Sequence, residues 1–144
     1  MQIEPALRDY LLSQATLREQ LGGRHVYAGR IPRGVRAPVV VVLSRVATSH
    51  RYTLAAEYGV IETVVAIEVH ARNDGAERKA LDIVDVIRPL VSSYRGTWGR
   101  GTDQRTVQGC TIETGAMPVA VYDDASDSWR FRYEMDLRIN HTLA

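Results

Sequence analysis

Residues 129–140, WRFRYEMDLRIN, decide the fold class, because apolar and polar side chains alternate along them without a break. The apolar set is Trp129, Phe131, Tyr133, Met135, Leu137 and Ile139. The polar set is Arg130, Arg132, Glu134, Asp136, Arg138 and Asn140. A period of two residues is typical of a β-strand with one buried face and one wet face. We therefore predict an antiparallel strand near the end of the chain.

Two further strands are expected upstream. Residues 60–71, VIETVVAIEVHA, alternate in the same way and turn Ile61, Val65 and Ile67 to one face. Pro38 opens a β-branched run that ends at Val46, and its four consecutive valines favour a strand that is apolar on both faces or central in its sheet. Residues 47–59 are expected to form a loop or a short strand end.

Shorter strands are expected between the second helix and the final strand. The stretches 107–114, VQGCTIET, and 119–122, VAVY, each have strand-like composition, and Pro118 separates them. Asp123, Asp124 and Asp127 mark a polar turn before the final strand. The glycine-rich stretch 95–106 is expected to be a loop with Trp98 in its middle.

Helical periodicity appears twice. Residues 4–21 are predicted to form one amphipathic helix, with Pro5 in the first turn and Gly22 at its end. A second helix follows Asp74, which has capping-box spacing to Glu77, and Pro89 should weaken its last turn. Its expected apolar face comprises Ala76, Ala80, Leu81, Val84, Ile87 and Val91.

The order α-β-β-α-β-β-β predicts an α+β fold: a mostly antiparallel sheet of about four to five strands with two helices packed on one face. The length suits a single domain over residues 1–144. The N-terminus lacks the apolar run of a signal peptide, and no stretch has the length of a membrane span, so we expect a soluble protein.

The charge balance excludes recruitment of partners by a global electrostatic field, because the net charge is only +1. Eighteen residues are cationic, yet Lys79 is the only lysine among them. Arginine excess fits either a GC-rich genome or interface use, since guanidinium groups make planar, bidentate contacts. Cys110 is the only cysteine, so it cannot form an internal disulfide, and we expect it to be a small core residue.

No constellation of residues predicts catalysis, metal binding or cofactor binding. The four histidines lie far apart and without a metal-ligand spacing: His25, His50, His70 and His141. Nucleophile and phosphate-loop motifs are absent from the sequence. The aspartates at 123–127 lack the calcium-loop pattern and are expected to be a solvated turn. We therefore predict a protein that is not an enzyme and needs no cofactor.

Arginine-rich segments are the candidate interaction sites. The predicted interface residues are Arg30, Arg33, Arg36, Arg95, Trp98, Arg100, Arg105, Arg130 and Arg132. On the final strand, the arginines can make cross-strand ion pairs or face another subunit, and both interpretations stay open. Trp98 between two arginines can anchor an interface, plug a local gap or stack a nucleic-acid base.

The arrangement of these blocks resembles the tail-completion, or tail-terminator, family of long-tailed phages. The resemblance begins with residues 7–34, LRDYLLSQATLREQLGGRHVYAGRIPRG, and continues through APVVVVLSRV at 37–46 and IETVVAIEVHARN at 61–73. A helix starting near Ala76, the Tyr122-Asp123 pair and the alternating final strand complete it.

The resemblance implies a structural protein of a virion, assembled in the cytoplasm of a bacterial host. It implies a ring, commonly hexameric, that caps the head-proximal end of the tail tube, stops its growth and presents a surface to the head connector. The implied partners are copies of the chain, the tail tube protein, connector proteins and the DNA that passes through the lumen. A phage and a domesticated phage-like particle stay equally open. The alternative is a small nucleic-acid-binding module that uses the arginine-rich loops.

Overall fold

The computed structural model describes residues 2–51, 60–72, 74–123 and 128–143. Its helices are α1 (Glu4–Leu12), α2 (Ala15–Leu21) and α3 (Glu77–Val91), with 3-10 turns at Asp74–Ala76 and Gly101–Asp103. Its strands are β1 (Val26–Ala28), β2 (Val39–Arg51), β3 (Val60–Ala71), β4 (Gly96–Trp98), β5 (Arg105–Asp123) and β6 (Ser128–Leu143).

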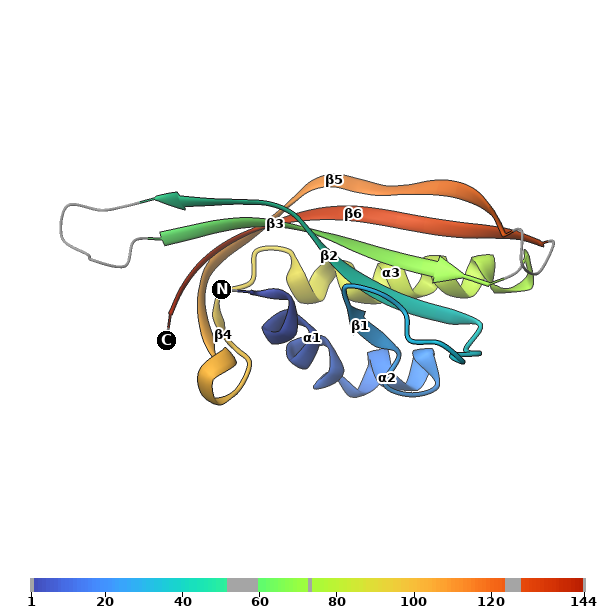
Figure 1. The fold of residues 1–144 in the computed structure, drawn as a ribbon, viewed down its shortest axis with the longest axis horizontal. Coiled ribbons are helices and arrows are strands. Elements are labelled where there is room, and N and C mark those ends of the chain that lie inside the picture. The colour runs from blue at the N-terminus through green and yellow to red at the C-terminus, as the bar shows by residue number, and fades with distance from the viewer. Residues whose placement is uncertain (1, 52–59, 73, 124–127, 144) are drawn as a thin grey trace.

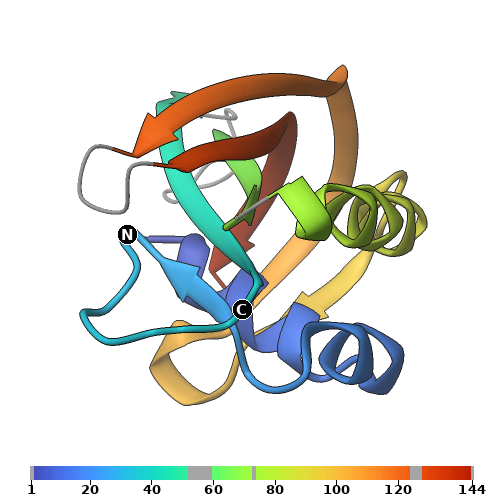
Figure 2. The ribbon, with the colours of Figure 1, turned by 90° about the vertical axis from the view of Figure 1, so that its right-hand side faces the viewer.

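The strands form one six-stranded sheet in the order β1-β2-β3-β6-β5-β4. The three α-helices lie together below β5 and β6 in Figure 1, and Figure 2 shows the long strands curving in cross-section. β1 runs parallel to β2, and every other pairing is antiparallel. The α+β class is confirmed, but the sheet has more strands than predicted and three α-helices cover it.

The predicted helix over 4–21 is wrong as a single element, because the chain breaks at Ser13 and Gln14. The Ser13 hydroxyl donates a hydrogen bond of 2.5 Å to the carbonyl of Tyr10, and Gln14 is extended with ψ 109°. A serine that bonds the preceding turn offers the backbone an alternative to continued helix. Gly22 ends α2 in the left-handed conformation with φ 70°, as predicted.

The start of α3 differs from the prediction. Its N-cap is Ala76 rather than Asp74, and the side chain of Asp74, on which the predicted capping box depends, lies outside the described residues. A 3-10 turn over Asp74–Ala76 separates the aspartate from the helix start. Glu77 accepts a hydrogen bond of 3.2 Å from the hydroxyl of Tyr133 on β6.

The buried face of α3 is shifted slightly from the predicted one. Ala80, Val84, Ile87 and Val91 are buried as expected. Leu81 is 43% exposed, however, and Ile83 takes its place in the core. Pro89 lies on the exposed side of the last turn, and the helix continues past it to Val91.

The strands are longer than the sequence predicts. β2 runs on through Arg51, in register with β3. Residues 105–123 form a single strand, in which three register shifts against β6 absorb Gly109 and the approach to Pro118. β-Bulges of this kind let a strand continue through residues that fit a regular ladder poorly. The stretch predicted to be a loop contains β4, which pairs Gly96–Trp98 with the start of β5.

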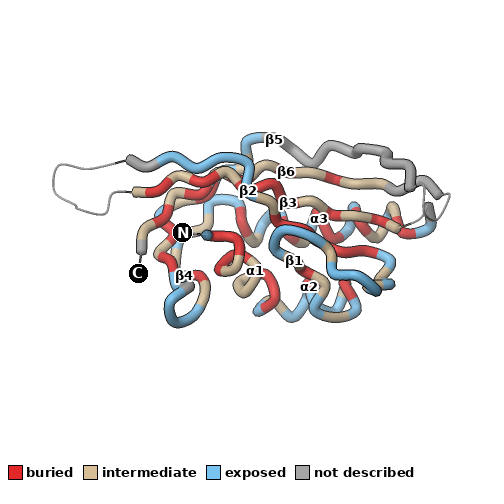
Figure 3. The backbone as a smooth tube through the Cα atoms, viewed as in Figure 1, coloured by how far each residue is buried: buried red, intermediate tan, exposed pale blue. Residues whose placement is uncertain are grey.

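The core lies between the sheet and the helices (Figure 3). The predicted inward face of β3 is buried throughout, and so are Tyr133, Met135, Leu137 and Ile139 of β6. The valine run of β2 is buried on both faces, as predicted, since Val40 and Val42 are only 5% and 4% exposed while Val39 and Val41 are fully buried. The long central strands therefore supply most of the buried sheet surface.

Candidate assembly surfaces

The predicted loop arginines lie on two exposed segments. Arg30, Arg33 and Arg36 are exposed between β1 and β2, and Arg95 and Arg100 flank β4 and are exposed too. These five guanidinium groups remain available to a partner in the described structure. The side chain of Arg130 lies outside the described residues.

Of the three roles left open for Trp98, the structure supports the plugging of a local gap. Its side chain is 1% exposed and stacks on Tyr10 and Tyr94, with ring centroids 5.3 Å and 5.2 Å away. The hydroxyl of Tyr10 also donates a hydrogen bond of 2.7 Å to the carbonyl of Leu90. Trp98 therefore joins α1 to the end of α3, and it is unavailable for base stacking or for an interface.

Arg105 is also buried rather than exposed. It is 5% exposed, and its guanidinium donates hydrogen bonds to the carbonyls of Thr102 and Gln104 at 3.0 Å and 2.8 Å. These bonds satisfy the carbonyls of the 3-10 turn before β5. The structure assigns this arginine to local folding, and that corrects its place among the surface candidates.

Arg132 and Arg138 on β6 make cross-strand ion pairs on the face of the sheet opposite the helices. Arg132 lies 3.3 Å from Glu68, and Arg138 lies 3.4 Å from Glu62 and also contacts Glu113. The ion-pair interpretation of the final strand is therefore confirmed for these two residues. About a third of each arginine side chain is exposed, so we expect each pair to contribute at most about 1 kcal/mol.

A second basic surface is not apparent from the sequence pattern. Arg18 of α2, Arg24 after it and Arg100 after β4 line one hollow, together with Asp9 of α1. All three arginines are exposed. Only Arg100 was predicted as an interaction residue, because no sequence signal joins the α2 segment to the residues after β4. Converging guanidinium groups can bind a phosphate or carboxylate group.

The sheet edges are the other feature that sequence patterns missed. β1 pairs only with Val41–Leu43, and β4 pairs only with Arg105–Val107. Each edge strand is three residues long, while the strands beside them are far longer. In Figure 1 the far part of β2 extends past the helices together with β3. Most of the outer side of β2 and β5 therefore lies beyond the reach of the edge strands.

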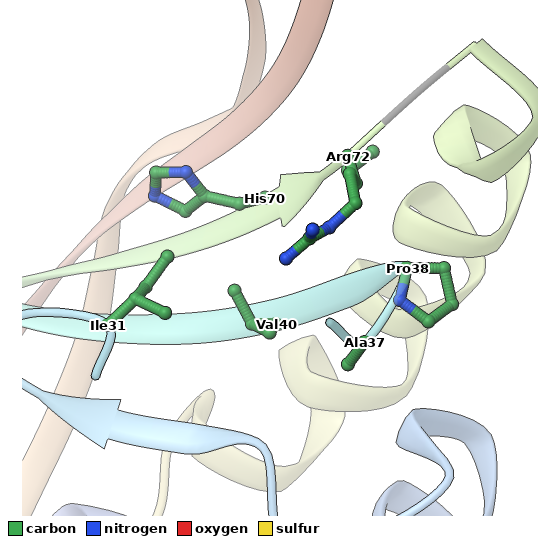
Figure 4. A pocket seen from close by; sticks show the side chains of 7 residues that line it. Ile31, Ala37, Pro38, Val40, His70 and Arg72 are labelled. Carbon is green, nitrogen blue, oxygen red and sulfur yellow. The ribbon is translucent and has the colours of Figure 1, made fainter. Parts of the chain in front are cut away.

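The structure gives little room for a small ligand at the hollow in Figure 4. This hollow is lined by Ile31, Pro38, Val40 and His70, among others, and by Arg72, which donates a hydrogen bond to the carbonyl of Val35. Its volume of about 20 Å³ suffices for roughly one water molecule.

No group of three His, Cys, Asp or Glu side chains in the described part of the chain is arranged to hold a metal ion. Burial raises the pKa of the Cys110 thiol to about 12, which fits the predicted core role and leaves it protonated at neutral pH.

None of the described helices has the length and apolar character needed to cross a membrane.

Comparison with known proteins agrees with these features. The family model described as tail completion protein gp17 matches residues 5–97. A chain of a solved structure entitled "Virion of native gene transfer agent (GTA) particle" has the same fold, with a TM-score of 0.65 and 16% sequence identity. The match covers 96% of this chain and 93% of that chain. No curated protein matches this sequence.

Proposed function

The chain belongs to the tail completion protein gp17 family, and on that premise we propose that it closes into a ring at the head-proximal end of a tail tube. As a member of this family it is a structural protein of the virion tail. In the proposed role the ring ends growth of the tube and presents a surface to the head connector. The ring is hexameric in this proposal.

The family match carries this proposal, and the surface chemistry supports it. A ring needs two different patches that meet head to tail. The exposed loop of Arg30, Arg33 and Arg36 lies between β1 and β2, and Arg95 lies before β4 at the other edge of the sheet. Opposite edges of one sheet are suitable places for two such patches.

The proposed partners are copies of this chain, the tail tube protein and the connector proteins. DNA that passes through the ring is proposed to meet arginine side chains without sequence-specific contacts, since phosphate contacts carry no sequence information. The nucleic-acid module stays the alternative. It loses its stacking residue, because Trp98 is buried.

Two measurements on the purified chain test the ring. The first is light scattering over a concentration series, with negative-stain images of the same fractions. The second adds the chain to polymerising tail tube protein and measures tube length. We expect discrete rings with a central hole, alone or on tube ends, and shorter tubes as the chain is added. Unaltered tube lengths together with the absence of rings in both settings would contradict the proposal.

Loop variants test the predicted interface. We expect Arg30→Glu with Arg33→Glu to weaken ring formation while the melting temperature of the monomer stays nearly unchanged. The matched control is Arg78→Glu with Arg88→Glu, two exposed arginines on α3. Equal loss of rings in both proteins would point to net charge instead of the loop.

A further inference from the structure

Two long strands have outer edges that nothing in the described chain covers beyond their first residues. The last hydrogen bond on the outer side of β2 runs from the Gly29 amide to the carbonyl of Leu43, at 2.9 Å. On β5 the Ser93 amide donates to the carbonyl of Cys110, at 3.1 Å. Beyond these points, residues 44–51 and 111–123 pair on one side only in the described structure.

The edge of β2 is the more regular of the two. Uncovered edges invite pairing, and bulges or proline interrupt that pairing locally. β5 has two register shifts after Cys110 and contains Pro118, whereas β2 has one shift, at Val46, and a regular register from Ala47 onward. Val46 is 59% exposed, and its neighbours from Arg45 to Ser49 are exposed as well.

An incompletely bonded carboxylate lies where β1 stops covering β2. Glu4 is 7% exposed, and its Oε1 atom lies 3.1 Å from Nε of Arg45. Its Oε2 atom is buried without a hydrogen-bond partner among the described residues. Glu4 and Arg45 line a hollow with Ala28, Gly29, Leu43 and Ser44, next to the point where the pairing of β1 with β2 ends. A buried acceptor without a donor costs about 1–3 kcal/mol, so a donor from a docked strand would stabilise this site.

The charges on the two uncovered edges indicate which strand each one pairs with. Residues 44–51 contain Arg45 and Arg51 and no acidic residue. Antiparallel pairing of two such edges centred on Thr48 would set Arg45 opposite Arg51, and like charges in that position are destabilising. Residues 111–123 contain Glu113 and Asp123 and no lysine or arginine. By sequence, the two uncovered edges therefore carry opposite charges and neither complements itself, although Arg45 also pairs with Glu4 and Glu113 with Arg138 within the chain.

We propose that the edge of β2 over residues 44–51 pairs with the edge of β5 over residues 111–123 in a second copy of this chain. The inference rests on the proposed ring and specifies its subunit contact. Such a contact joins two different patches, so it repeats head to tail and can close a ring. It continues one sheet from subunit to subunit and covers both edges.

The first experiment compares Val46→Lys with Leu81→Lys, since both residues are exposed apolar side chains, on β2 and α3. Lysine on an edge strand opposes pairing. We expect Val46→Lys to raise the concentration for half-assembly by roughly tenfold or more, equivalent to about 1.4 kcal/mol, and Leu81→Lys to leave it within about twofold. Where rings form only on tubes, the same comparison is made with tubes present.

The second experiment mixes two single variants, Thr48→Cys and Thr111→Cys, under mild oxidation. Both threonines are exposed, and the native Cys110 can stay because it is buried. We expect disulfide-linked pairs that contain one copy of each variant. A linked pair formed by Thr48→Cys alone would overturn the proposal in favour of β2 pairing with itself. A second pair of single variants, Ser49→Cys on β2 and Glu113→Cys on β5, tests a second register.

The outcomes separate this inference from the proposed function. If the unchanged chain and Val46→Lys form rings equally well, or if no mixed disulfide forms in either register, the edge pairing is wrong while the ring stands. If the unchanged chain forms no ring either alone or on tubes, the proposed function itself fails.

Discussion

Tyr10 and Trp98 stack with ring centroids 5.3 Å apart and an interplanar angle of 21°, although they come from the first helix and from a strand in the second half of the chain. Tyr94 packs against both rings. The contact joins α1 to the loop that follows α3, so the surface carrying Arg95 and Arg100 depends on it for its position.

Replacing Trp98 tests this role. Trp98→Ala removes a large buried ring, and we expect it to lower the free energy of unfolding by about 3–5 kcal/mol. Denaturant unfolding of the purified chain measures the loss. Trp98→Phe keeps an aromatic ring, so its loss should be clearly smaller. An alanine variant with unchanged stability that fails to assemble would instead support the original interface interpretation.

The Cys110 thiol predicts a dependence of stability on pH. Its pKa is about 12 in the folded chain and lies near 9 in its ordinary range, because burial disfavours the thiolate. The contribution of this thiol to the free energy of unfolding is therefore fully present below about pH 9. It falls between about pH 9 and 12, because the thiol of the unfolded chain loses its proton first. We expect a slope of up to about 1.4 kcal/mol per pH unit from this group.

Urea unfolding at several pH values between 8 and 11, compared with Cys110→Ala, measures that slope. The alanine variant should be less stable at pH 8, yet lose less stability as the pH rises. Tyr10 and Tyr133 contribute in both proteins, since burial raises the pKa of each above the ordinary value. Parallel curves for the two proteins would show that the thiol is not the cause.

Replacing Gly22 and Gly109 compares a glycine in the left-handed conformation with one that is not. An added Cβ meets nothing within 4 Å at either glycine, but Gly22 has a φ of +70° and Gly109 has no such left-handed angle. We expect Gly22→Ala to cost about 1 kcal/mol and Gly109→Ala to be nearly neutral in thermal unfolding. An equal cost at both positions would mean that side-chain packing, and not the left-handed angle, sets it.

The hollow of Arg18, Arg24 and Arg100 predicts weak, sequence-independent binding of DNA. Arg24→Gln with Arg100→Gln should lower affinity for duplexes of any sequence and reduce the salt slope by roughly one for each phosphate that is no longer neutralised. Fluorescence anisotropy over a salt series measures both quantities. Arg78→Gln with Arg88→Gln, on exposed positions of α3, is the control with equal charge. Equal effects in the two proteins would leave only net charge as the cause.

The two central strands show what a pattern can predict. β3 has the predicted bounds, and β6 has the predicted alternation, because one buried face repeats every second residue along each strand. The break after Leu12 and the 3-10 turn before α3 were not predicted. Both depend on hydrogen bonds of single turns, which compete closely with continued helix.

Some of the candidate surface residues could likewise be predicted from the sequence, and others could not. The exposed loop of Arg30, Arg33 and Arg36 could be predicted, since its proline, glycine and charge place it at the surface. Trp98 and Arg105 could not, because an arginine-rich and glycine-rich stretch resembles an exposed loop until its neighbours are known. The ring of Tyr10 and the carbonyls of the 3-10 turn decide their burial.

By itself, the sequence determined the α+β class, the faces of the central strands, the buried thiol and the resemblance to a tail-completion family. These depend on periodicity and on local composition, which act over a few residues. Only the tertiary structure decided the order of the strands, the length of the uncovered edges and the meeting of Arg18 with Arg100. Such contacts join segments far apart in the chain, and packing of the whole sheet against its helices selects them.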